Sequence, residues 1–144
     1  MIHHVSIPVS DPEGTAHVVA QLFDGRVTPF RAYEGGYIAW TDDEAGTSVE
    51  FFPVGTQMVP AADAGMVEFR HLEGASPFGA THLTLSVDRT VEQVQELARS
   101  AGWRAEVVSR GPHDVIEFWV ENAVMVEVMT PEMTAGFLAE VRPG

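Results

Sequence analysis

The stretch HVSIPV at residues 4–9 returns as HLTLSV at residues 82–87, and VEF at residues 49–51 returns as VEV at residues 126–128. The first two stretches alternate between apolar and polar residues, a pattern that is typical of a β-strand with one buried face. Each half of the chain therefore carries a histidine and, at almost the same spacing further on, a glutamate. Such an internal repeat predicts two structural modules of one kind in tandem.

The segments around these motifs repeat in the same order. In the first half we predict a strand, a helix and three strands, at residues 2–9, 13–23, 27–33, 37–41 and 47–53. In the second half the same succession is predicted at residues 82–87, 91–101, 104–109, 115–120 and 124–129. The expected fold class is α+β, built from two βαβββ modules.

These elements are expected to form one domain over residues 1–144, because a chain of this length can bury a single core. Its expected parts are module 1 (1–53), a connector (54–80), module 2 (81–131) and a C-terminal helix within 132–144.

Composition excludes several classes of function. The formal net charge is −13, and every basic residue is an arginine, so a nucleic-acid or anionic membrane partner is not expected. The chain has no cysteine, which excludes disulfides and thiolate chemistry. We find neither a secretory signal nor an apolar stretch that could span a bilayer, and we expect a cytoplasmic protein.

The alternation also assigns side chains to faces. On the two repeated strands, His4 and His82 share their faces with small polar residues, whereas the intervening aliphatic residues point the other way, toward the helix of their own module. Glu50 and Glu127 have the parity to face the same cavity as the histidines, together with Phe52, Met125 and Met129. Two imidazoles and two carboxylates are a suitable ligand set for a divalent cation.

The motifs at residues 4–11, 49–51, 79–87 and 126–129 resemble those of the vicinal oxygen chelate superfamily, which includes glyoxalase I, methylmalonyl-CoA epimerase, extradiol dioxygenases and fosfomycin or bleomycin resistance proteins. The resemblance implies a cup of two βαβββ modules that holds a divalent metal ion (Ni, Zn, Co, Mn or Fe). Carried over to this chain, the metal ligands are His4, Glu50, His82 and Glu127. It also implies a small-molecule substrate and a homodimer, with the site lying within one chain or between two.

Members of the superfamily that bind glutathione usually carry an arginine on the first strand, where this chain has Pro8. A glutathione hemithioacetal is therefore not the expected substrate. The four-ligand set favours a lyase or isomerase in which the metal stabilises an enediolate and Glu127 or Glu50 acts as the general base. If Glu50 is not a ligand, two histidines and one carboxylate favour a dioxygenase-like enzyme. The alternative from another class is a binding protein that sequesters a small molecule, as bleomycin-resistance proteins do.

Three further residues keep a second interpretation open. His3 has the opposite parity to His4 and is expected on the helix side of its strand. His113 lies in a Gly-Pro loop, where an exposed histidine is the simpler interpretation and a proton shuttle the alternative. Glu117 lies on the penultimate strand, where it faces either solvent or the cavity.

Overall fold

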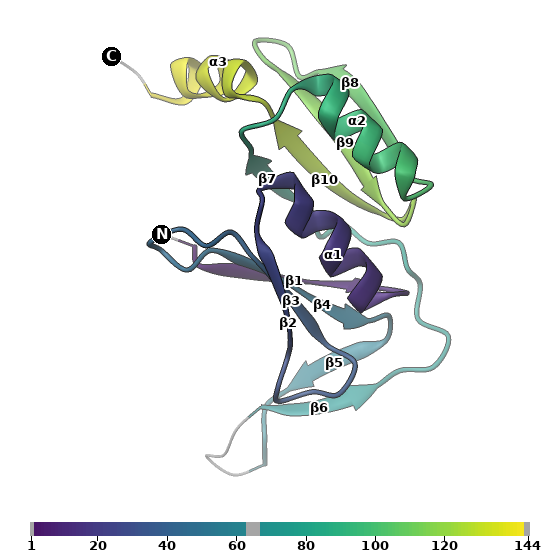
Figure 1. The fold of residues 1–144 in the computed structure, drawn as a ribbon. Coiled ribbons are helices and arrows are strands. Elements are labelled where there is room, and N and C mark those ends of the chain that lie inside the picture. The colour runs from purple at the N-terminus through teal and green to yellow at the C-terminus, as the bar shows by residue number, and fades with distance from the viewer. Residues whose placement is uncertain (1, 63–66, 143–144) are drawn as a thin grey trace.

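The computed structural model describes residues 2–62 and 67–142 and shows two four-stranded sheets, each with one helix (Figure 1). The first module contains β1 (His4–Val9), α1 (Pro12–Leu22), β2 (Arg26–Pro29), β3 (Tyr37–Trp40) and β4 (Ser48–Pro53). The second contains β7 (Leu83–Ser86), α2 (Val91–Ser100), β8 (Arg104–Ser109), β9 (Asp114–Val120) and β10 (Val124–Met129). The prediction of an α+β fold with two βαβββ modules is confirmed.

The two sheets have the same topology. Their strand orders are β1-β4-β3-β2 and β7-β10-β9-β8, so the first strand of each module lies at one edge and pairs in parallel with the last strand. The other pairings are antiparallel. Because first and last strands are neighbours, the histidine-bearing and glutamate-bearing segments of each module lie side by side.

Local sequence explains where the helices begin. Asp11 caps α1 by accepting a hydrogen bond from the Gly14 amide, and Pro12 occupies the first turn, where its missing amide costs no hydrogen bond. Thr90 and Gln93 form a reciprocal capping box at the start of α2. Each helix therefore starts directly after the first strand of its module.

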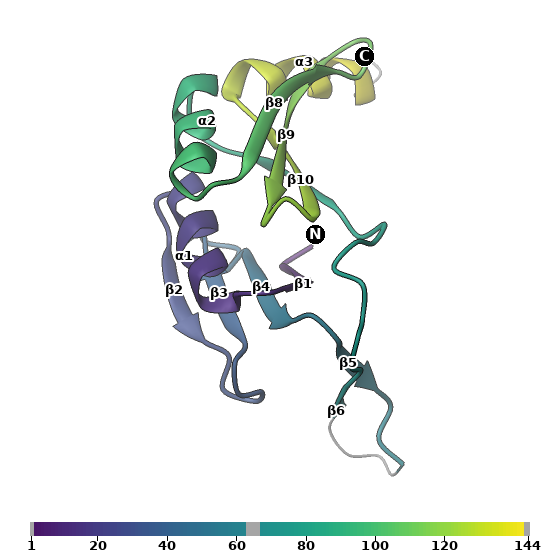
Figure 2. The same cartoon turned by 90° about the vertical axis from the view of Figure 1, so that its right-hand side faces the viewer.

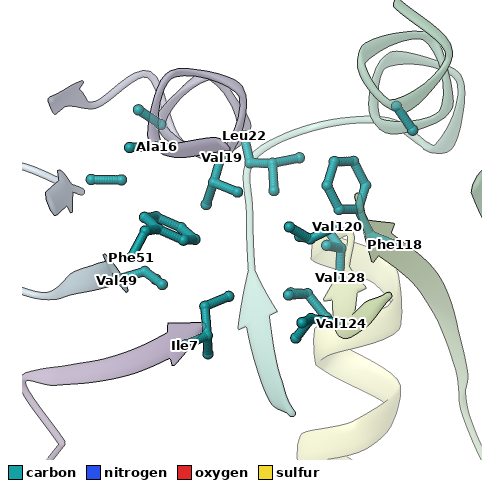
Figure 3. Close-up of a cluster of buried hydrophobic side chains, with 14 of the residues drawn as sticks. Ile7, Ala16, Val19, Leu22, Val49, Phe51, Phe118, Val120, Val124 and Val128 are labelled. Atoms are coloured by element: carbon teal, nitrogen blue, oxygen red, sulfur yellow. The ribbon is translucent and has the colours of Figure 1, made fainter. Parts of the chain in front are cut away.

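One hydrophobic core joins the two modules. Its largest buried side chains include Ile7 and Phe51 from the first sheet and Phe118 and Val128 from the second. Figure 3 shows Ile7 and Phe51 across from Val128, with Leu22 of α1 extending toward Phe118. The helices α1 and α2 lie next to each other on one side of the two sheets (Figure 2). The two modules are thus packed into one body.

The connector contains structure that the sequence did not predict. A two-stranded antiparallel hairpin, β5 (Thr56–Val59) and β6 (Glu68–His71), follows β4 and extends away from the two sheets (Figure 2). At the other end of the chain, α3 (Pro131–Val141) corresponds to the expected C-terminal helix. No helix within residues 2–62 and 67–142 is long and apolar enough to cross a membrane.

Candidate functional site

The first module brings together His4, Ser6 and Glu50. Ser6 on β1 lies directly opposite Glu50 on β4, and its Oγ donates a 2.7 Å hydrogen bond to Glu50 Oε2. The imidazole Nε2 of His4 lies 3.9 Å from the other carboxylate oxygen, Oε1. The Glu50 side chain is only 11% exposed, whereas that of His4 is 57% exposed. A hydroxyl therefore holds one carboxylate oxygen, and the second faces an imidazole nitrogen.

The second module repeats the hydroxyl–carboxylate pair. Thr84 on β7 lies opposite Glu127 on β10, and its Oγ1 donates a 3.0 Å hydrogen bond to Glu127 Oε2. In both modules the same oxygen is held by the side chain two residues after the histidine. Such a hydrogen bond orients a carboxylate and leaves its other oxygen available for a cation.

His82 departs from this symmetry. It lies just before β7, and its Nδ1 is 3.1 Å from the carbonyl oxygen of Ala80. In the second module the partner of the corresponding carboxylate oxygen is instead Arg110, whose Nε donates a 2.9 Å hydrogen bond to Glu127 Oε1. The strand predicted to begin at His82 begins at Leu83, and His82 does not face the carboxylate as His4 does.

Arg110 also binds a second carboxylate. Its Nη2 donates a 2.9 Å hydrogen bond to Glu117 Oε1, and the indole of Trp119 donates to Glu117 Oε2 at 3.2 Å. The hydrogen bond from Arg110 holds the pKa of Glu117 below its usual range, against the effect of partial burial. The same two carboxylates raise the pKa of Arg110. Glu117 therefore lies on the same face as Glu127.

Sequence reasoning missed Arg110, although the sequence held a signal for it. In the hairpin register, Glu117 on β9 lies directly opposite Glu127 on β10. Two like charges at facing positions destabilise a sheet unless a cation neutralises them. A cation was therefore to be expected near the two predicted strands. Arg110 lies one short turn before β9, the strand that carries Glu117.

Within one chain three of the four predicted ligands, His4, Glu50 and Glu127, are divided between two separate half-sites, and His82 lies outside both. We define the first half-site as His4, Ser6 and Glu50, and the second half-site as Thr84, Glu127 and Arg110. No group of three or more histidine, aspartate or glutamate side chains that could hold a metal ion occurs within residues 2–62 and 67–142. The donor chemistry of each half nevertheless fits a divalent cation, because a hydroxyl orients each carboxylate and Glu127 Oε1 already binds a positive charge.

A hollow of about 730 Å³ lies over β2 and β3 of the first module. Ile38, which lines it, lies opposite Glu50 in the sheet, so hollow and carboxylate are on the same face. Trp40 also lines it, with the guanidinium of Arg26 5.2 Å from the ring centroid. The remaining lining residues are Thr28, Pro29, Phe30, Arg31 and Ala32. This surface combines aromatic area with positive charge, which suits an organic group that carries oxygen atoms.

His3 and His113 lie outside the half-sites. The Nδ1 of His3 is 2.7 Å from the carbonyl oxygen of Ala45. His113 pairs with Glu140 at 2.8 Å and stacks edge-on against Phe137, so it holds α3 in place. The simple interpretation of His113 as an exposed loop residue is not what the structure shows, because its side chain is only 15% exposed.

Comparison with solved structures identifies the fold. The fosfomycin resistance protein FosX from Mesorhizobium loti is 14% identical, with 95% of this chain and 96% of that chain covered at a TM-score of 0.57. A glyoxylase/bleomycin resistance protein/dioxygenase domain from Frankia sp. EAN1pec is 16% identical (coverage 90% and 96%, TM-score 0.56). A possible glyoxalase from Bacillus cereus is 13% identical (90% and 97%, 0.54).

The chain shares the fold of these solved structures, which is the fold that the resemblance of its sequence motifs implied. No protein-family model matches the chain, and no curated protein is significantly similar to it in sequence. At these identities the solved structures establish the fold, and the function has to be argued from the two half-sites.

Proposed function

We propose that this chain, with its vicinal oxygen chelate fold, is a divalent-metal-dependent enzyme of the glyoxalase or epimerase type that acts on a small oxygen-bearing substrate. The observation that carries the proposal is the repeated geometry of Ser6 with Glu50 and of Thr84 with Glu127. A buried carboxylate is costly unless it is hydrogen-bonded and paired with a cation. Two such carboxylates, each held in the same way on pseudo-equivalent strands, support a metal-binding role.

His4, Glu50, His82 and Glu127 would hold the ion. Once bound, it would supply a Lewis acid that polarises a substrate carbonyl and stabilises the charge left by loss of a neighbouring proton. Glu50 or Glu127 is the base that would accept this proton. Ser6 and Thr84 keep the two carboxylates in position, because each donates a hydrogen bond to one carboxylate oxygen, Oε2. The hollow beside Ile38 would bind the rest of the substrate.

Two alternatives are tied to particular residues. If Glu50 does not ligate the ion, the remaining two histidines and one carboxylate favour a dioxygenase-like enzyme. The contact between Arg110 and Glu127 favours a protein that sequesters a small molecule without a metal, because the guanidinium then serves permanently as the counterion of the carboxylate.

Metal content tests the proposal. Untagged wild-type protein is expected to retain close to one divalent ion per site, measured by elemental analysis. Glu127→Ala and His82→Ala should lose most of it, because each removes a ligand. His71→Ala is the control, since this histidine lies on β6 beside Glu73 and outside both half-sites. Wild-type protein that stays metal-free after incubation with Zn²⁺, Mn²⁺ or Co²⁺ would contradict the proposal.

Turnover then separates the chemistries. The substrates to compare are 2-oxoaldehyde hemithioacetals, 2-methyl-acyl thioesters and catechols, each with the metal-loaded protein. Conversion of either of the first two would support proton transfer next to a carbonyl. Ring cleavage of a catechol would identify the dioxygenase alternative, and tight binding without turnover would identify the sequestering one.

A further inference from the structure

Arg110 donates a hydrogen bond to the Glu127 oxygen that a metal ion would need as its ligand. Glu127 Oε2 is held by Thr84, and the free oxygen, Oε1, accepts from Arg110 Nε at 2.9 Å. In the first module the corresponding oxygen of Glu50 faces His4 at 3.9 Å. In the second half-site a guanidinium group therefore binds the carboxylate oxygen to which a metal ion would have to bind.

The arrangement is specific to the second module. The residue opposite Glu50 is Ile38, whereas the residue opposite Glu127 is Glu117. The extra carboxylate of Glu117 gives Arg110 a second partner at 2.9 Å. Without a cation the two carboxylates would repel each other across the hairpin. Either the guanidinium or a metal ion can neutralise them.

The two cations exclude each other at Glu127 Oε1. A zinc ion bound to a carboxylate lies about 2.0–2.2 Å from its oxygen, and a guanidinium that donates to the same oxygen would bring two positive charges into contact. The Arg110 backbone is fixed, because its amide donates to the His113 carbonyl oxygen at 2.8 Å. Its side chain, however, is 32% exposed and can swing into solvent without disturbing the sheet.

We propose that Arg110 is a latch: it neutralises Glu117 and Glu127 in the metal-free protein, competes with the metal for Glu127, and is displaced when a divalent ion binds. Arg110 is thus a residue that sets the metal affinity of the site without being a ligand. This inference rests on the proposed function only in taking Glu127 as a metal ligand.

Zinc titration by calorimetry on untagged, metal-free protein tests the latch. Arg110→Ala is expected to bind Zn²⁺ about three- to thirtyfold more tightly than wild type, because the ion no longer has to displace a charge-assisted hydrogen bond. Arg110→Gln is a second variant that keeps a donor but not the charge, and it should also bind more tightly. In the absence of metal, Arg110→Ala should melt at a lower temperature than wild type, because Glu117 and Glu127 then repel each other.

Arg104→Ala is the matched control. Arg104 lies on β8 opposite Trp119, on the same face of the sheet. Among the described residues the guanidinium that donates to Glu127 is that of Arg110, not that of Arg104. Arg104→Ala removes the same charge from the same face. If this variant gained as much affinity for Zn²⁺ as Arg110→Ala, the gain would be a general electrostatic effect and the latch would be overturned. Unchanged or weaker Zn²⁺ binding by both Arg110 variants, with wild type binding normally, would also overturn it while leaving the metal site intact.

The remaining outcomes separate the latch from the proposed function. If wild type binds no Zn²⁺ but Arg110→Ala does, and Glu127→Ala in that background abolishes binding, the latch is supported and the natural chain is not metal-dependent. If neither wild type nor the Arg110 variants bind Zn²⁺, both proposals are overturned.

Discussion

The carboxylate of Glu121 ties the second module to the first. Glu121 lies in the turn between β9 and β10, with a φ of 51°, and accepts hydrogen bonds from the amides of Ser10 and Asp11 at 2.5 and 2.6 Å. The hydroxyl of Thr15 donates to it at 3.1 Å. These donors lie at the start of α1, where amides lack partners within the helix and a negative charge is favourable. Glu121 thus holds the two modules together next to β1.

Glu121→Ala is expected to destabilise the protein by about 2 kcal/mol, because three donors lose a charged acceptor. Glu121→Gln should lose less, since it keeps an acceptor oxygen without the charge. Urea denaturation followed by circular dichroism measures the difference. Glu44→Ala, which removes an exposed carboxylate from the loop between β3 and β4, is the control and should change little. A Glu121→Ala variant as stable as this control would show that Glu121 does not hold the two modules together.

At the residue scale the alternation predicted the faces of Glu50 and Glu127 but not what these side chains contact. Glu50 and Glu127 have the parity that the alternation assigned to them, and Ser6 and Thr84 lie on the same faces. The contacts of Arg110 with Glu127 and of Glu121 with α1 join parts of the chain that no periodic pattern relates. Periodicity reports the face of a side chain and says nothing of its partner on another element.

Among the elements, the β5–β6 hairpin was not predicted. Its strands are short, and β5 and β6 carry no strong alternation of apolar and polar residues. The hairpin is held by Phe69, whose ring packs against Phe30, Tyr33 and Phe52 with centroids 4.8 to 6.3 Å apart. Phe52 follows Glu50 on the same face of β4. The hairpin therefore packs, through Phe69, against the part of β4 that follows Glu50 of the first half-site.

Phe69→Ala is expected to lower the free energy of unfolding by about 2 kcal/mol, because it removes a half-buried ring that packs against three other aromatic rings. Hydrogen exchange of the β5 and β6 amides should accelerate more than that of β7 and β10. Met58→Ala is a suitable control, because Met58 lies opposite Phe69 in the hairpin but is 47% exposed. Unchanged exchange in Phe69→Ala would show that the aromatic cluster does not hold the hairpin.

At the scale of the whole molecule, a metal ion held by all the proposed ligands requires the two half-sites to come together. The structure shows β1 and β7 each at the edge of a separate sheet, and the half-sites are not assembled into one group of ligands among the described residues. We propose that they are completed either by rearrangement of the two modules of one chain or, as we favour, across a homodimer. In a symmetric dimer the first half-site of one chain would face the second half-site of the other.

Mixing two inactive variants distinguishes these arrangements. His4→Ala lacks a ligand in the first half-site, and Glu127→Ala lacks one in the second. If the site lies between two chains, unfolding and refolding an equal mixture should restore about a quarter of the wild-type metal content, because half of the dimers are mixed and each has one intact site. Each variant refolded alone should stay near zero. No recovery in the mixture, with dimers present by light scattering, would place the site within one chain.

The sequence by itself determined the two βαβββ modules and the faces on which His4, Glu50 and Glu127 lie. These features follow from local alternation, helix caps and an internal repeat, all of which act over a few residues. Only the tertiary structure decided that Arg110 binds Glu127 Oε1, that Glu121 accepts from the amides of Ser10 and Asp11, and that Glu50 and Glu127 lie in separate half-sites within one chain. The physical reason is that such contacts depend on how distant elements pack, and packing is set by the shared core rather than by any local pattern.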